Sequence, residues 1–365
     1  MQTSRATVDR LLDPENDSAT LITLEKAALV LGKRLRVALV GQMKEPLQTQ
    51  MIPTRIESTL AQYDITVSSI TRMDTLWNTM LRLRSDDGKE YALRLYNSAI
   101  RDIKLIRQEI AFIRHVASFA DIQVPVSIPT REGDEIATVY VDEDPTFACM
   151  FEWIEGEDLR GRASVETARL IGRATACLHR AARTYPFPVS GDGMRESYRW
   201  DEGLVSEHHA WIDQRDAVIG PERSTLLHKI VDQVAAQLTA IPKTRDTYGM
   251  IHADLHQGNF IEHDGVVAVI DFDQLGRGHF AYDLANVRTE LKSEPVDTDA
   301  LWHAVKTGYS EILPLPLQSD ADLEPFLLAG ELGFLDWYYN SPNPEVREQL
   351  SARFEHTWTV LLSML

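Results

Sequence analysis

The stretch Ile251–Asp273, IHADLHQGNFIEHDGVVAVIDFD, constrains the fold more than any other part of the chain. Two apolar runs flank the turn sequence HDG at 263–265, and Asp-Gly between such runs predicts a β-hairpin. A polar segment precedes the first run and predicts an irregular loop. A hairpin folds the chain back on itself, so its second strand returns Asp271 toward Asn259 and Asp254. The sequence therefore predicts two carboxylates and one carboxamide at the open end of a rigid element.

These three groups are the ones that phosphoryl transfer requires. One carboxylate must orient or deprotonate the attacking hydroxyl, and hard oxygen ligands must hold Mg²⁺ against the nucleotide phosphates. In protein kinases the pattern H-R-D-x-x-x-x-N puts an Asn five residues after the catalytic Asp, with a metal-binding Asp on a later turn. Asn259 follows Asp254 at the same five-residue spacing, and Asp271 comes after both, in the same order. The alternative is that Asp254 and Asn259 are only turn-forming residues of a surface loop, where both types are common.

Three motifs, HADLHQGNF, IDFD and AYDLANV, resemble the aminoglycoside phosphotransferase and choline kinase family. The resemblance implies an α+β, protein-kinase-like two-lobe fold, with a small antiparallel-sheet lobe and a larger, mainly helical lobe. It implies ATP and Mg²⁺ as cofactors, Asp254 as the catalytic base or orienting group, and Asn259 and Asp271 as Mg²⁺ ligands. Asp273 is implied, more weakly, as a carboxylate behind these ligands or at a second metal.

The resemblance also implies a division of the chain. Residues 1–53 form an N-terminal extension outside the resemblance, residues 54–152 a small nucleotide-binding lobe, and residues 153–365 a large lobe with the catalytic loop and the substrate site. In the extension, helix-forming residues run into a basic cluster. A basic amphipathic segment can touch a membrane or a partner, but we expect an accessory packing element.

The small lobe is expected to hold the nucleotide. Its predicted elements are a short helix at 55–63, strands at 65–70, 79–83, 91–96, 136–141 and 147–151, and a helix at 102–119 with an apolar residue every three or four positions. Arg94 falls where kinases place the cation that grips phosphates, and Glu109 where they place its carboxylate partner. The alternatives are a water-facing Arg94 on an edge strand and a surface Glu109. The segment EWIEG resembles the hinge, where the carbonyl of Glu152 and the N–H of Ile154 would bind adenine.

The large lobe is expected to be helical. Predicted helices cover 164–182, with Ser164 as N-cap, and 223–241, 297–312, 323–339 and 345–365, whereas 186–221 is expected to be an irregular insertion. His179 is expected to be a packed structural histidine. Asp283 is expected to tie down the catalytic loop by accepting hydrogen bonds from backbone N–H groups.

Composition bounds the class of protein. The 365 residues are 44% hydrophobic, yet no apolar stretch approaches the roughly 18 residues of a membrane span, and the first residues show no signal-peptide core. Two cysteines give no disulfide framework, which suits a reducing cytoplasm. A net charge of −18 argues against a nucleic-acid partner, because phosphate backbones attract basic surfaces.

The resulting hypothesis is an ATP-dependent phosphotransferase that acts on a hydroxyl of a small molecule, such as an aminoglycoside, an amino alcohol or a related metabolite. One alternative is a protein serine/threonine kinase of the same fold, and another is a nucleotide-binding regulator without turnover. A regulator has no chemical reason to keep Asp254, Asn259 and Asp271 together. The sequence leaves the acceptor and the oligomeric state open.

Overall fold

The computed structural model describes residues 55–73, 78–96, 101–141, 144–186, 198–291, 297–340 and 351–363. All of these lie in one compact unit, residues 55–365. The expected extension at 1–53 lies outside the described residues, as does most of the turn between the first two strands. The expected boundary between the lobes at 152/153 stays a prediction.

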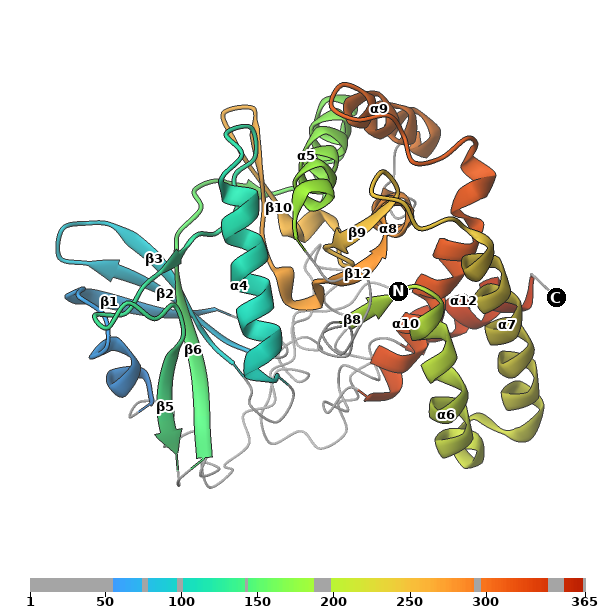
Figure 1. The fold of residues 1–365 in the computed structure, drawn as a ribbon, viewed down its shortest axis with the longest axis horizontal. Coiled ribbons are helices and arrows are strands. Elements are labelled where there is room, and N and C mark those ends of the chain that lie inside the picture. Colours follow the sequence, from blue (N-terminus) through green and yellow to red (C-terminus); the bar gives the residue numbers. More distant parts are fainter. Residues whose placement is uncertain are drawn as a thin grey trace, which may run out of the picture. The chain divides into compact units, whose positions relative to one another are not determined.

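The small lobe is built on an antiparallel sheet of six strands, in the order β1-β2-β3-β6-β4, with β5 paired to β6 (Figure 1). The register of each pair is antiparallel throughout, as the predicted strands require. The two-residue strand β4 was not expected, and β1 runs three residues beyond the predicted strand end. The strands are β1 (Val67–Met73), β2 (Thr79–Ser85), β3 (Glu90–Leu95), β4 (Ser127–Ile128), β5 (Ala137–Val141) and β6 (Asp144–Glu152).

Strand β3 divides its side chains between two environments, because successive residues of a strand point to opposite faces. Leu93 and Leu95 pack into the small-lobe core with residues of β2, β5 and β6. Tyr96 and the partly buried Ala92 join the larger core that contains helix α4. The side chain of Arg94 belongs to the same face as Ala92 and Tyr96, as the alternation predicts.

Helix α4 (Ile103–Ala117) lies beside the small-lobe sheet on its large-lobe side (Figure 1). Its N-cap Asp102 accepts a hydrogen bond of 2.7 Å from the N–H of Lys104. An apolar stripe faces the core, as the sequence period predicts: Ile106, Ile110, Ile113 and Val116 are all at most 2% exposed. Glu109 lies within this stripe and is 1% exposed, so a carboxylate is held inside the apolar face.

The large lobe consists mainly of helices around two small sheets (Figure 1). One sheet has the order β11-β10-β7 and the other β8-β12-β9. The helices are α5 (Val165–Thr184), α6 (Glu202–Ile219), α7 (Pro221–Ala240), α8 (Phe280–Leu291), α9 (Thr298–Ser310), α10 (Glu324–Asn340) and α12 (Ser351–Leu362). The strands are β7 (Glu157–Asp158), β8 (Tyr198–Trp200), β9 (Tyr248–Ile251), β10 (Phe260–His263), β11 (Val266–Val269) and β12 (Gly276–His279).

Helix α5 anchors the large lobe against α9. Ser164 caps α5 in a capping box with Thr167, as predicted. The two helices approach so closely at Gly172 and Gly308 that a Cβ on either would lie 2.0 Å or less from a carbonyl oxygen of the other helix. His179 of α5 is fully buried and stacks on Phe280, so the expectation of a packed structural histidine is confirmed.

The expectation of an irregular insertion at 186–221 was wrong. Strand β8 and helix α6 occupy most of it, and Asp201 caps α6 by accepting a hydrogen bond from the N–H of Gly203. Charged residues between the apolar ones concealed the helix. The signal that was overlooked is the seven-residue spacing of Val205, Ile212 and Ile219, all of which are buried.

Candidate active site

The predicted hairpin, formed by β10 and β11, is present in the structure. Strands β10 and β11 pair from Phe260↔Val269 to His263↔Val266, and Asp264 and Gly265 take the positive φ angles of a tight hairpin turn. At the open end, the N–H of Ile270 donates to the carbonyl of Asn259 over 3.0 Å. The fold-back therefore places the residue before Asp271 directly beside Asn259.

The loop before the hairpin is fixed by hydrogen bonds from helix α8. The Asp283 carboxylate, fully buried, accepts from the N–H of His252 (3.0 Å) and the N–H of Ala253 (2.7 Å). Asn286 donates its amide to the carbonyl of Ala253 over 2.7 Å. Ala253 has a φ of 66°, a conformation that costs a non-glycine residue about 1–2 kcal/mol. The anchoring role predicted for Asp283 is thus present in the structure, and its bonds offset the strain.

His252 links this loop to the end of the second hairpin strand, β11. Its Nε2 lies 2.9 Å from the carbonyl oxygen of Ile270, and its Nδ1 accepts from the N–H of Asp254 over 3.3 Å. The ring also packs against Phe272 with centroids 4.7 Å apart. Sequence reasoning recognised His252 only as part of a motif and missed this bridging position.

Asp254 presents its carboxylate to the space in front of the loop. The side chain is 47% exposed, and Nε2 of His256 lies 3.8 Å from its Oδ2. The Nδ1 of His256 accepts from the N–H of Gly258, which orients the ring. Partial burial raises the pKa of the Asp254 carboxyl above its ordinary value, and the nearby imidazoles of His256 and His252 oppose this only in part.

Asn259 is arranged as a ligand for a cation would be. Its amide nitrogen donates to the carbonyl of Asp254 over 2.8 Å, and the residue is 4% exposed. This bond fixes the plane of the carboxamide and leaves its oxygen for another group. The five-residue spacing therefore has a local structural cause, because the Asn side chain closes the loop that Asp254 opens.

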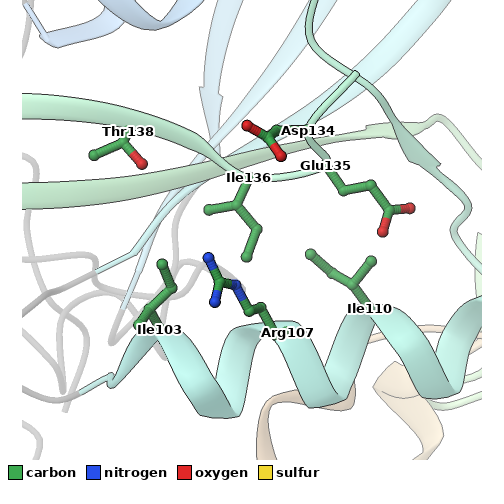
Figure 2. Close-up of a pocket in the computed structure, with 7 residues that line it drawn as sticks. All are labelled: Ile103, Arg107, Ile110, Asp134, Glu135, Ile136 and Thr138. Carbon is green, nitrogen blue, oxygen red and sulfur yellow. The ribbon is translucent and has the colours of Figure 1, made fainter. Parts of the chain in front are cut away.

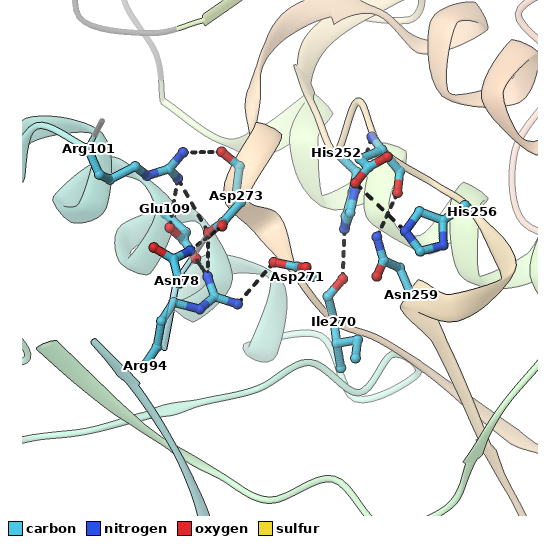
Figure 3. Close-up of polar contacts among 11 residues, drawn as sticks. Asn78, Arg94, Arg101, Glu109, His252, His256, Asn259, Ile270, Asp271 and Asp273 are labelled. Atoms are coloured by element: carbon cyan, nitrogen blue, oxygen red, sulfur yellow. Dashed lines mark hydrogen bonds and ion pairs between the residues drawn. The ribbon is translucent and has the colours of Figure 1, made fainter. Parts of the chain in front are cut away.

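Asp271 has a left-handed backbone conformation, which directs its side chain away from that of Phe272. Its φ and ψ are 64° and 66°, and its side chain is 45% exposed. The next residue, Phe272, is fully buried and packs on Phe112 of helix α4 with centroids 6.3 Å apart. The turn thus buries the aromatic ring and presents the carboxylate outward, beside Asn259 and His252 (Figure 3).

Arg94 and Glu109 form the expected ion pair. Arg94 Nη1 lies 2.9 Å from Glu109 Oε1, and the two side chains are 9% and 1% exposed. The water-facing Arg and the surface Glu are therefore both excluded. Arg94 also reaches the turn, with Nη2 3.0 Å from Asp271 Oδ1 and Nη1 2.5 Å from Asp273 Oδ1 (Figure 3). Burial by itself would lower the pKa of Arg94, but the Asp273, Glu109 and Asp271 carboxylates outweigh it and raise that pKa.

Two small-lobe residues that sequence reasoning missed also contact the turn. Asn78, immediately before β2, donates to Asp273 Oδ2 over 2.6 Å. Arg101 donates to the main-chain carbonyl of Asp273 and, over 2.9 Å, to Glu109 Oε2. Both carboxylate oxygens of Asp273 are therefore engaged by donors of the small lobe. Neither Asn78 nor Arg101 belongs to a local motif, so the sequence offered no signal for them.

The expected hinge lies where β6 ends. The N–H of Glu152 donates to the carbonyl of Val126 (2.9 Å), and the N–H of Trp153 donates to that of Glu90 (3.2 Å). Ile154 follows as a buried residue. These bonds fix the main chain around Glu152 and Ile154, whose contact with adenine stays a prediction.

A separate pocket of about 310 Å³ lies between α4 and the segment leading into β5 (Figure 2). Arg107 lines it, whereas Glu109, two residues later, points about 200° away around the helix. None of the candidate catalytic residues lines this pocket, so it is distinct from the candidate active site. Its lining residues are Ile103, Arg107, Ile110, Asp134, Glu135, Ile136 and Thr138.

The donor set around Asp271 suits Mg²⁺ better than a transition metal. Within the described ranges, no three His, Cys, Asp or Glu side chains are grouped as a metal centre. Mg²⁺ commonly takes one or two protein oxygens and completes its shell with water and substrate phosphates. Asn259 and Asp271, which adjoin one another across the hairpin, offer such a pair.

The helices of the described ranges are all too short or too polar to span a bilayer.

Comparisons with known proteins place this chain among phosphotransferases. The model of the phosphotransferase enzyme family (APH) matches residues 77–314. Amicoumacin kinase of Bacillus subtilis (strain 168) is 25% identical over 201 residues, which are 54% of this chain and 56% of that kinase's length. The serine/threonine protein kinase RdoA of Salmonella typhimurium (strain LT2) is 21% identical over 286 residues, 78% of this chain and 82% of that protein.

A solved structure supports the fold independently. Amicoumacin kinase hAmiN, in complex with AMP-PNP, Ca²⁺ and Ami, superposes with a TM-score of 0.70 at 18% identity and covers 86% of this chain and 94% of that one. The predicted α+β, two-lobe, protein-kinase-like fold is thereby confirmed, as is the resemblance drawn from the three motifs. The family model covers well over half of the sequence, and this chain belongs to the phosphotransferase enzyme family.

Proposed function

We propose that this protein transfers the γ-phosphoryl group of ATP to a hydroxyl of a small molecule, with Mg²⁺ as cofactor. The observation that carries the proposal is the convergence of Asp254, Asn259 and Asp271 at one end of the hairpin, with the Arg94–Glu109 pair beside them. Phosphoryl transfer depends on positioning and on neutralising charge, and this arrangement provides groups for both.

Each side chain has a role in this proposal. The half-exposed carboxylate of Asp254 accepts the hydrogen bond, and then the proton, of the acceptor hydroxyl. Asn259 and Asp271 hold Mg²⁺, which when bound would neutralise charge on the nucleotide phosphates. Arg94 binds phosphate oxygens. Its Nη2 donates one bond to Asp271 Oδ1 and carries a second N–H that a phosphate oxygen can accept. Glu152 and Ile154 bind adenine through their main-chain groups.

Two observations support a small hydroxylated acceptor such as an aminoglycoside or amino alcohol. The amicoumacin kinases, which act on a small molecule according to their names, match in sequence and in fold. The net charge of −18 would also favour a cationic substrate over an anionic one. A cytoplasmic location, and the absence of nucleic-acid and membrane partners, remain predictions from the composition.

The protein serine/threonine kinase remains the second candidate, because RdoA matches over most of its length. The two candidates share the phosphate and metal machinery and differ only in the acceptor. A non-catalytic regulator is disfavoured, since nucleotide binding alone does not need a half-exposed carboxylate at Asp254 in addition to the metal ligands.

The test is ADP release from Mg·ATP with a panel of aminoglycosides, amino alcohols, other hydroxylated metabolites and generic protein substrates. The blank is Asp254→Asn, which keeps the shape of the side chain and removes the base. ADP above the blank with one small molecule is the expected result. Signal with proteins alone would establish the second candidate. Binding of Mg·ATP without turnover of any acceptor, by wild type and variant alike, would favour the regulator.

A further inference from the structure

Arg101 is a buried cation that the proposed function leaves unassigned. It immediately precedes Asp102, the N-cap of helix α4, and its side chain is 7% exposed. A buried charge is costly unless it is paired and hydrogen-bonded. The partners that stabilise the buried guanidinium therefore indicate the role of Arg101.

The partners of Arg101 come from three separate segments. Its Nη2 donates to Glu109 Oε2 over 2.9 Å, and its Nη1 donates to the main-chain carbonyl of Asp273. Its guanidinium also lies over the ring of Tyr198 in β8, 5.7 Å from the centroid. Arg101 thus joins helix α4 to the turn that carries Asp271 (Figure 3). Its ring contact adds the first residue of β8.

Glu109 is held by two arginines, one on each oxygen. Arg94 uses Oε1 and Arg101 uses Oε2, both at 2.9 Å. The carboxylate of Glu109 therefore cannot rotate away from Arg94 without losing its bond to Arg101. A lysine could not replace either residue fully, because only the planar guanidinium fork reaches two acceptors in fixed directions.

Arg101 and Arg94 contact the turn through different groups, Arg101 through a main-chain carbonyl and Arg94 through side-chain carboxylates. Arg94 binds the carboxylate of Asp271, the group that Mg²⁺ would also need. Arg101 instead binds the main chain two residues later and leaves that carboxylate free. When Asp271 changes partner from Arg94 to a cation, the bond from Arg101 to the carbonyl of Asp273 can persist. The left-handed turn at Asp271 thus keeps an anchor that does not compete with the metal.

We propose that Arg101 is a positioning residue, which fixes the Asp271–Asp273 turn to helix α4 so that Asp271 stays in place for Mg²⁺ while Arg94 stays in place for the phosphates. This inference rests on the proposed function, because it assigns Asp271 to the metal. It assigns Arg101 no contact with the substrates. Residues that orient metal ligands typically account for 10- to 100-fold in metal affinity or activity.

The experiment measures ATP binding by calorimetry, with and without Mg²⁺, in wild type, Arg101→Lys and a control. Arg101→Lys keeps the charge that balances Glu109 but cannot hold the carboxylate and the carbonyl together. The matched control is Arg180→Lys, because Arg180 also pairs with a carboxylate (Asp121) and lies over an aromatic ring (Phe119), remote from the site. Thermal unfolding of each protein separates folding from positioning.

Arg101→Lys is expected to lose about tenfold in affinity for Mg·ATP and to need about tenfold more Mg²⁺ for half of the metal effect. Its affinity for metal-free ATP is expected to stay within about threefold of wild type, as is every affinity of Arg180→Lys. Equal losses with and without Mg²⁺, or a lowered Tm with unchanged affinities, would overturn the positioning role. If wild type itself bound no ATP, the proposed function would fail, and the inference with it.

Discussion

The two sides of the candidate active site are held in place by different interactions. The loop from His252 to Asn259 is fixed from within the large lobe, by the buried carboxylate of Asp283 and the amide of Asn286. The turn from Asp271 to Asp273 is fixed largely from the small lobe, by ion pairs and hydrogen bonds of Arg94, Arg101 and Asn78. The loop is thus secured by one lobe, and the turn by the contact between the two.

Because of this difference, we expect the turn, and not the loop, to change its contacts during a reaction cycle. The two bonds that Asp283 accepts from the loop are buried, so nucleotide, salt and metal have little access to them. Asp271 is nearly half exposed and is paired with the same Arg94 that would bind phosphates. In the proposed function, binding of Mg·ATP therefore rearranges the partners on the turn, while the loop that carries Asp254 stays as it is.

The largest expected effect comes from breaking the turn side at Asp271. Asp271→Ala should lower the rate of ADP release by about a thousandfold or more, because the metal loses its carboxylate and the phosphates lose their counter-charge. The free energy of unfolding should change little, since the side chain is half exposed. The control is Asp264→Ala in the same hairpin, an aspartate that also has a positive φ but is 92% exposed. Substantial activity in Asp271→Ala would remove Asp271 from the mechanism.

The loop side should respond differently to Asp283→Asn. An amide cannot accept from both N–H groups and His179 as the carboxylate does, so the protein should lose about 2 kcal/mol of stability. Displacement of Asp254 should lower kcat by up to about a hundredfold. The KM for Mg·ATP should hardly change, because the turn and Arg94 are secured elsewhere.

Urea unfolding and steady-state kinetics check this prediction together. Asp297→Asn is the matched control, since Asp297 accepts from two N–H groups at an exposed helix start, far from the loop. It should cost at most about 1 kcal/mol and leave kcat unchanged. A rise in KM for Mg·ATP as large as the fall in kcat would show that loop and turn are not independent.

The turn and the loop are connected by one pair of strands, because β12 follows the turn and pairs with β9, which leads into the loop. His279, the last residue of β12, gives a way to measure how this pair contributes to stability. Burial, reinforced by Lys243, lowers the pKa of His279 to about 4, while Asp201 and Glu202 oppose this. Between about pH 6.5 and pH 4 the unfolded chain therefore binds a proton on His279, whereas the folded protein keeps this residue neutral. The contribution of His279 to the free energy of unfolding should be fully present above pH 6.5 and should fall by up to about 3 kcal/mol as the pH drops toward 4.

Urea unfolding between pH 7 and pH 4.5 checks this dependence in wild type and His279→Leu. Both ring nitrogens of His279 are buried without hydrogen-bond partners in the described structure, so leucine removes the titration without breaking a bond. The variant should lose less stability than wild type across this window. Parallel pH profiles for the two proteins would assign the acid sensitivity to other groups.

The sequence predicted the parts of the site that local patterns encode. The spacing of Asp254 and Asn259 reflects a bond that closes one loop, and the Asp-Gly turn sets the hairpin that returns Asp271. Arg94 and Glu109 were placed by motif order, and the apolar stripe of α4 shows why Glu109 is buried.

The sequence could not reveal groups that act only across long distances in the chain. Asn78 and Arg101 contact the turn from positions about 170 to 200 residues away, and no periodicity or turn chemistry marks them. Helix α6 was missed for another reason, because polar residues between its apolar ones suggested an irregular segment. The lesson matches the comparison of the two sides. The loop, built from neighbouring residues, was predictable, whereas two of the three anchors of the turn, Asn78 and Arg101, were not.

The smallest expected effect concerns the strain stored in the loop at Ala253, whose φ is 66°. Ala253→Gly relieves the strain but adds freedom to the unfolded chain, so stability should change by no more than about 1 kcal/mol. Ala253→Val should destabilise by more than that, because a β-branched residue resists this backbone conformation. Activity of the glycine variant should stay within about threefold of wild type, measured as ADP release, because Asp283 and Asn286 hold the main chain whatever its side chain. A tenfold loss at unchanged stability would mean that the methyl group of Ala253, and not the hydrogen bonds, keeps Asp254 in position, and the loop would then be the less secure of the two sides.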